Sequence, residues 1–116
     1  MSNLIVKNII DSDIAVATDA GDKVFNEIVY HLSKKHVVIL DFNEITILTT
    51  AFLNAAIGQL YSNDSFSSEF LNDNLKVING QSEDKPLFSM VIRRAKEYFK
   101  NKKGFEDSAN SAFYDK

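Results

Sequence analysis

The feature that most constrains the fold is the apolar run at residues 37–40, Val-Val-Ile-Leu, which is closed by Asp41. A short, continuous and mostly β-branched run without alternation predicts a strand covered on both faces, in the middle of a sheet. Amphipathic helical patterns precede and follow it. Strands that alternate with helices predict an α/β domain with a short, mostly parallel sheet, joined by right-handed crossovers.

Two helices are predicted on either side of this strand. Apolar residues recur at spacings of three and four from Val24 to Leu32, so we expect a helix from Asp19 to the Lys34-Lys35 pair, capped by Thr18 or Asp19. After the loop at residues 42–46, Thr49 or Thr50 starts a second helix. Its apolar positions are Phe52, Leu53, Ala56, Ile57, Leu60 and Tyr61.

The rest of the chain supplies further strands and a third helix. Residues 4–10 predict a strand, and residues 14–16 a second one that returns beside it as a hairpin. Residues 62–74 predict a loop anchored by aromatic contacts or a short irregular helix, and residues 75–80 another strand. The third helix starts near Pro86, with an apolar face formed by Leu87, Val91, Ala95, Tyr98 and Phe99.

This order gives about four strands and three helices in one domain at residues 1–103, because 116 residues suit a single domain. Residues 104–116 form a C-terminal tail, which either packs back on the domain or orders only upon binding.

Composition excludes several classes of function. A net charge of -3 argues against attraction of the whole surface to nucleic acid or to an anionic membrane, and the chain has no cysteine for a disulfide or a thiolate site. The apolar start is too short for a membrane span and lacks the features of a signal peptide. We therefore expect a cytoplasmic protein.

Enzyme signatures are absent from the sequence. It has no glycine loop for phosphates, no pair of histidines one helical turn apart and no nucleophile elbow. His31 and His36 could join Asp41 at a metal ion, but solvated or capping histidines are the simpler interpretation. We expect a protein without catalysis, cofactor or metal.

The third helix is basic in its C-terminal half, at Arg93, Arg94, Lys96, Lys100, Lys102 and Lys103. Cations there stabilise the negative end of the helix dipole on a solvated face. The alternative, binding to a phosphate backbone, predicts association that weakens steeply with salt.

Residues 37–61 carry the most informative motif. Asp41 stands at the carboxyl end of the buried strand, and Thr49 and Thr50 stand where the next helix starts. Exposed amides and the positive dipole end at such a position favour an anion or a phosphate.

This segment resembles the signature of STAS domains, in which an apolar strand ends in Asp and a helix opens with Asp-Ser-Ser-Gly. It resembles more closely the STAS-like family of unknown function, whose run is Asp-Phe, a hydrophobic residue, then small hydroxyl residues before Phe. The matching residues here are Asp41-Phe42, Ile45 and Thr49-Thr50-Ala51-Phe52. The resemblance covers roughly residues 14–99, including Gly21.

The resemblance implies a partner-switching mechanism. In anti-sigma factor antagonists, one serine of the motif is phosphorylated by a partner ATPase of the histidine-kinase type, and the unphosphorylated protein binds that partner. The motif's first Ser falls on Thr50, and its second Ser, the usual phosphoacceptor, falls on Ala51. Thr50 or Thr49 would then be the phosphorylated residue, with plain helix capping as the alternative.

The sequence thus predicts a regulatory, protein-binding signalling module of the bacterial anti-sigma factor antagonist type, and the alternative is a sensor of a small molecule or nucleotide. The predicted partner-binding residues are Asp19, Gly21, Asp41, Phe42, Asn43, Glu44, Thr49, Thr50, Ala51 and Phe52.

Overall fold

The computed structural model describes residues 2–62 and 66–98, so the predicted tail at residues 104–116 lies outside the described residues. Its sheet has the order β1-β3-β5 and is parallel throughout, with β1 at Ser2–Ile5, β3 at Val38–Asp41 and β5 at Leu75–Ile78. The prediction of an α/β fold with β3 in the middle of a parallel sheet is confirmed. A separate parallel pair joins β2 (Ile14–Ala15) to β4 (Ile47–Leu48), instead of one sheet of about four strands.

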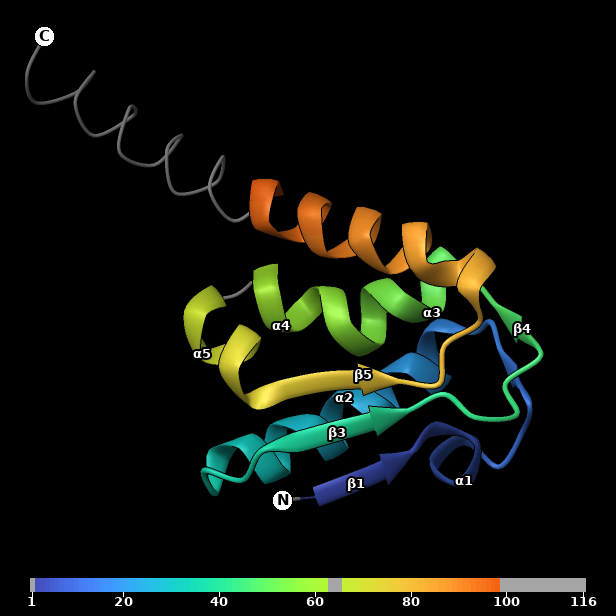
Figure 1. Cartoon of the computed structure of the whole chain (residues 1–116), viewed down its shortest axis with the longest axis horizontal. Coiled ribbons are helices and arrows are strands. Elements are labelled where there is room, and N and C mark those ends of the chain that lie inside the picture. The colour runs from blue at the N-terminus through green and yellow to red at the C-terminus, as the bar shows by residue number, and fades with distance from the viewer. Residues whose placement is uncertain (1, 63–65, 99–116) are drawn as a thin grey trace, which may run out of the picture.

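The three-stranded sheet is covered on one face. In β3, Val38 and Leu40 are fully buried, whereas Ile39 and Asp41 are partly exposed. Figure 1 shows α2 (Thr18–Ser33) behind the strands, and no helix of the described residues crosses their front. The prediction that β3 is covered on both faces was wrong, because the helices gather on one side of the sheet.

The N-terminal apolar run divides into two elements. β1 stops at Ile5, where its four-residue register with β3 ends, and α1 follows at Val6–Ile10. Val6 is buried and Ile9 and Ile10 pack against the core, a helical spacing of three and four. The predicted strand at residues 4–10 was therefore wrong in its second half, and so was the hairpin, since β2 pairs with β4 rather than β1.

α2 packs against the sheet and the second helical segment as its periodicity predicts, with Val24, Ile28 and Leu32 buried. The start of α2 differs from the prediction, because its N-cap is Ala17, which makes no side-chain cap hydrogen bond. The prediction that Thr18 or Asp19 caps this helix was wrong.

Residues 50–62 form one continuous helical run: α3 (Thr50–Leu53), the π-helical turn η1 (Asn54–Gly58) and α4 (Gln59–Ser62). At the π turn the Gln59 backbone N–H bonds to the carbonyl of Asn54, five residues back. The Ala55 carbonyl, which that N–H would reach in an α-helix, accepts instead from the Gln59 side chain at 2.8 Å. The same amide donates to Asp22 of α2 at 2.9 Å, so it ties the π turn to α2.

The segment before β5 contains a short helix, α5 (Ser68–Asn74), in agreement with one of the two predicted alternatives. The Ser67 side chain caps it by accepting from the Phe70 N–H at 3.0 Å, and the Phe66 ring stacks on Phe70.

After the 3-10 turn η2 (Ser82–Asp84), a final helix spans residues 85–98 of the described chain. Val91 and Ala95 are buried as predicted, but Tyr98 is exposed. Phe88 and Ile92 are partly buried against the core instead, so the apolar stripe is turned towards β5. Phe99 lies outside the described residues.

No helix within residues 2–62 and 66–98 is both long and apolar enough to span a membrane.

Candidate functional site

The loop after β3 is braced by the carboxylate of Asp41. Its Oδ1 accepts a hydrogen bond from the Asn43 backbone N–H at 2.8 Å and another from the Asn79 side-chain amide at 2.9 Å. Asn79 follows β5, so one carboxylate joins the loops that leave two neighbouring strands. Asp41 therefore fixes this end of the sheet.

Phe42 anchors the same loop from beneath. It is buried, and its ring meets Phe88 of the final helix edge to face, with 5.0 Å between ring centroids. A turn follows in which Glu44 adopts a φ of 65° and its carboxylate lies 3.1 Å from Lys7 Nζ of α1. Since both charges of this pair are exposed, it contributes little to stability, and Glu44 with the neighbouring Asn43 forms an accessible tip.

The β2–β4 pair leaves large apolar side chains in solvent. Ile14 and Ile47 are directly paired in register, which puts them side by side on one face, and they are 43% and 51% exposed. Val16, directly after β2, is 36% exposed. We call Ile14, Val16 and Ile47 the apolar patch.

Polar contacts to the backbone hold this pair of strands in place. The Thr46 N–H donates to the Asp13 carbonyl at 2.8 Å, and the Thr46 hydroxyl lies 3.1 Å from the Asp13 carboxylate. The Thr49 N–H donates to the Ala15 carbonyl at 3.1 Å. The apolar patch is thus positioned without being buried.

The two threonines at the start of α3 differ in their contacts. The Thr49 hydroxyl donates to the Val16 carbonyl at 2.9 Å and accepts from the Phe52 N–H at 3.3 Å, so the predicted capping by Thr49 is confirmed. Thr50, the first residue of the helix, is partly exposed, and its hydroxyl has no hydrogen-bond partner among the described residues. Ala51 beside it is exposed.

Three other predicted site residues take different places. Asp19 is exposed in the first turn of α2, where its carboxylate accepts from the Ala20 N–H at 3.0 Å. Gly21 and Phe52 are buried: a Cβ on Gly21 would lie 2.5 Å from the Phe52 carbonyl oxygen. These two residues shape the surface from beneath by letting α2 and α3 approach closely.

We call the accessible group formed by the apolar patch, Asn43, Glu44, Thr50 and Ala51 the β2–β4 corner. The sequence prediction missed Ile14 and Val16, which it placed in a hairpin strand. One signal was present: this apolar stretch is short and stands between the polar residues 11–13 and 18–19. Its exposure depends on pairing with β4, which is distant in sequence.

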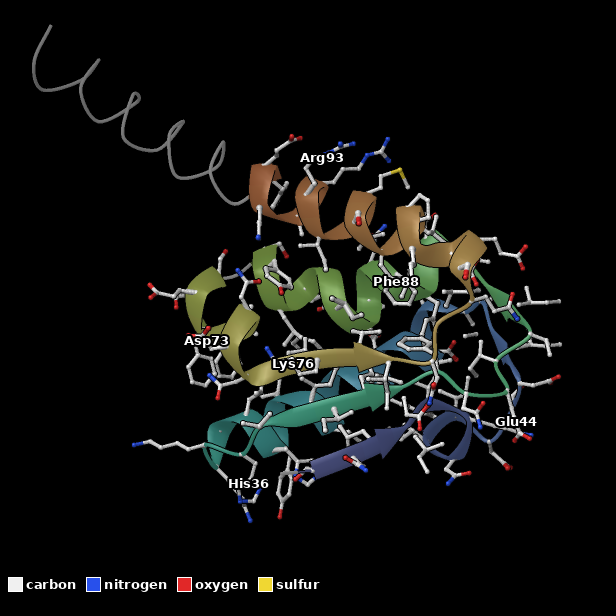
Figure 2. The ribbon with its side chains drawn as sticks, in the orientation of Figure 1. His36, Glu44, Asp73, Lys76, Phe88 and Arg93 are labelled. Atoms are coloured by element: carbon white, nitrogen blue, oxygen red, sulfur yellow. The ribbon has the colours of Figure 1, made fainter. Side chains whose placement is uncertain are left out.

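The histidines do not support the metal alternative. The His31 and His36 rings lie 6.0 Å apart between centroids near the end of α2, whereas Asp41 stands at the opposite end of β3. Figure 2 shows His36 and Glu44 at opposite ends of the sheet. Within the described part of the chain, no group of three His, Cys, Asp or Glu side chains could hold a metal ion.

A family model described as a STAS-like domain of unknown function matches residues 20–85, more than half of the chain. The match includes the loop after β3 and the helical run at residues 50–62, and β2 precedes it. No curated protein and no solved structure matches the chain. The resemblance inferred from residues 41–52 is therefore confirmed.

Proposed function

The chain belongs to the family of STAS-like domains of unknown function, and we propose that it is a non-catalytic regulatory module that binds a protein partner through the β2–β4 corner. The observation that carries the proposal is the apolar patch, next to a helix start whose Thr50 hydroxyl makes no hydrogen bond within the described residues. Apolar side chains held in solvent on a fixed frame gain free energy when a partner covers them.

The polar groups around the corner support binding rather than catalysis. The Asp41 Oδ1 is engaged by two donors, Glu44 is paired with Lys7, and the Thr49 hydroxyl both donates and accepts. These contacts position backbone and loops. A general acid or base must instead be free to reach a reacting atom.

Thr50 is the residue that we propose as the switch. A phosphate on Thr49 would remove the proton that its hydroxyl donates to Val16, whereas a phosphate on Thr50 would break no hydrogen bond among the described residues and would stand at the positive end of the helix dipole. It would add close to two negative charges beside the apolar patch, and an apolar partner surface would then have to desolvate them. By resemblance, the partner is a histidine-kinase-type ATPase, and it is the partner that binds ATP.

Affinity capture from a native lysate tests the docking surface. We expect Ile14→Asp and Ile47→Asp to lose a partner that the wild type retains, because each places a charge in the patch. Ile5→Asp is the matched control, since Ile5 is 41% exposed on β1 of the other sheet. A partner retained by all three variants, or lost by all three, contradicts the proposal.

The switch is tested separately by capture with Thr50→Glu and Thr50→Val, and by mass spectrometry of the wild-type chain for phosphate. Thr50→Glu should release the partner, Thr50→Val should retain it, and phosphate should be found on Thr50 and not on Thr49. Retention by both variants without phosphate on Thr50 would leave a constitutive binding module and reject the switch.

A further inference from the structure

A groove runs between β5 and the final helix, and none of its residues belongs to the β2–β4 corner. One hollow of about 540 Å³ has an apolar lining that includes Val77 and Ile78 of β5 and Phe88 and Ile92 of the helix. Phe88 lies between the final helix and β5 in Figure 2. A second hollow of about 460 Å³ continues along the helix and shares Ser89 and Ile92 with the first. The two hollows therefore form an elongated site.

One wall of the groove is a strand edge. β5 pairs with β3 on one side and, among the described residues, has no strand on its other side. The Ile78 carbonyl accepts from the Phe42 N–H across the β3 side, so Ile78 directs its backbone groups towards β3. Because these groups alternate in direction along a strand, the N–H and C=O of Val77 point outwards, where an added strand would pair with them.

The rim of the groove is positively charged. Lys85 lines the first hollow, and Arg93 and Lys96 line the second, opposed by the single carboxylate of Glu97. The whole chain carries a net charge of -3, so this surface has the opposite sign to the molecule. It would attract an acidic segment and repel a basic one.

We propose that this groove binds an extended acidic segment of a partner protein, which adds as a strand to the outer edge of β5. Side chains alternate along such a segment, so apolar residues enter the hollow beside Phe88 and Ile92, and acidic residues meet Lys85, Arg93 and Lys96. The protein then has a second ligand, on a surface distinct from the corner of the proposed function.

Fluorescence anisotropy with pooled peptides of about eight residues tests the proposal. One pool alternates Val, Ile, Leu or Phe with Asp or Glu, and the matched pool carries Lys or Arg in place of the acids. We expect the acidic pool to bind and the basic pool not to bind. Arg93→Glu should weaken binding about tenfold or more. Arg94→Glu is the matched control: it is also exposed on this helix but lines a different hollow, with Gly58 and Ser62, and should bind like the wild type.

Backbone pairing is tested with the tightest peptide, N-methylated at alternate residues in either of the two registers. Strand addition predicts that one register abolishes binding and the other does not, since only every second amide faces β5. Equal effects of both registers, equal weakening by Arg93→Glu and Arg94→Glu, or no preference for the acidic pool would overturn the proposal. Self-association of the wild type that Arg93→Glu removes, without peptide binding, would assign the groove to a second copy of the chain and also overturn it.

Discussion

The three-stranded sheet and the β2–β4 pair are both parallel and both carry aliphatic side chains, yet they use them in opposite ways. In the sheet, Leu40 is fully buried, and Leu4, its register partner on β1, is buried beside it. In the β2–β4 pair, Ile14 and Ile47 stand side by side in solvent. Burial of Val38 and Leu40 supports the first ladder, whereas the second has only Ala15 fully buried and is flanked by hydrogen bonds from Thr46 to Asp13 and from Thr49 to Ala15.

The two ladders therefore differ in where their exposed aliphatic residues lie. In the three-stranded sheet, the central strand β3 buries Val38 and Leu40, and the exposed residues Ile5, Val77 and Ile78 lie on the outer strands. In the β2–β4 pair, Ala15 is buried, while the directly paired residues Ile14 and Ile47 are exposed, and it is this exposed pair that we propose as a binding surface.

The comparison is tested most strongly by truncating one aliphatic side chain in each ladder. Leu40→Ala should lower the free energy of unfolding by about 2–5 kcal/mol, because it leaves a cavity in the core. Ile47→Ala should change it by less than about 0.5 kcal/mol, because the side chain is already half exposed. Urea denaturation measures both. Similar losses for the two variants would show that the β2–β4 pair also depends on burial.

The frame beneath the corner depends on a close helix contact at Gly21. Gly21→Ala should cost about 1–3 kcal/mol, since the new Cβ would meet the Phe52 carbonyl and Ala55 inside van der Waals distance. Gly58→Ala is the matched control, because its Cβ would meet Asn54 and Val91 at 3.4 and 3.5 Å. We expect it to be neutral or slightly stabilising in thermal unfolding. If Gly21→Ala proves as mild as Gly58→Ala, α2 and α3 do not need their close approach.

The two threonines offer a finer test of how the corner is held. Thr49→Ala removes a helix cap and should cost about 1 kcal/mol. Thr50→Ala should cost less than about 0.5 kcal/mol, because no hydrogen bond of its hydroxyl is lost among the described residues. Chemical denaturation of both variants checks the order; the reverse order would remove the structural reason for choosing Thr50 as the switch.

The smallest expected effect concerns Tyr61, whose side chain is buried. Burial raises the pKa of its hydroxyl above 10.0. The folded state then holds the proton longer than the unfolded state, so this contribution to stability is complete below pH 10.0 and is lost as the pH rises through the folded pKa. Tyr61→Phe should therefore lose less stability than the wild type between neutral pH and about pH 11, measured by urea denaturation. Parallel curves for the two proteins would contradict this.

Periodicity predicted the elements whose apolar residues face the core from one side. α2 and the helical run at residues 50–62 follow from spacing alone, and the central place of β3 follows from its continuous apolar run. The division of residues 4–10 into a strand and a helix does not follow from spacing, because the apolar residues at 4, 5, 6, 9 and 10 satisfy a strand and a short helix equally well. The length of the partner strand decided between them.

The candidate site was predictable only in part. Asp41 and the two threonines were found through the strand-loop-helix motif. Which threonine caps the helix and which has a hydroxyl without a hydrogen bond among the described residues depends on the contact between Thr49 and Val16, and the motif does not show that contact. The apolar patch as a pair of strands could not be found, because residues 14 and 47 become neighbours only through a pairing that spans thirty-three positions. The short apolar stretch between polar residues was a local signal, but it does not show that Ile14 is exposed, which depends on that pairing.

The π turn at Asn54–Gly58 also affects how relatives of this chain should be aligned. A π turn holds one residue more than the α-helical turn it replaces, so residues after it are rotated relative to a regular helix that starts at Thr50. A relative without the turn should have a one-residue gap near this position, and should lack the pairing of Gln59 with Asp22 that accompanies it. An ungapped alignment of such a relative would match surface positions with core positions from Leu60 onwards.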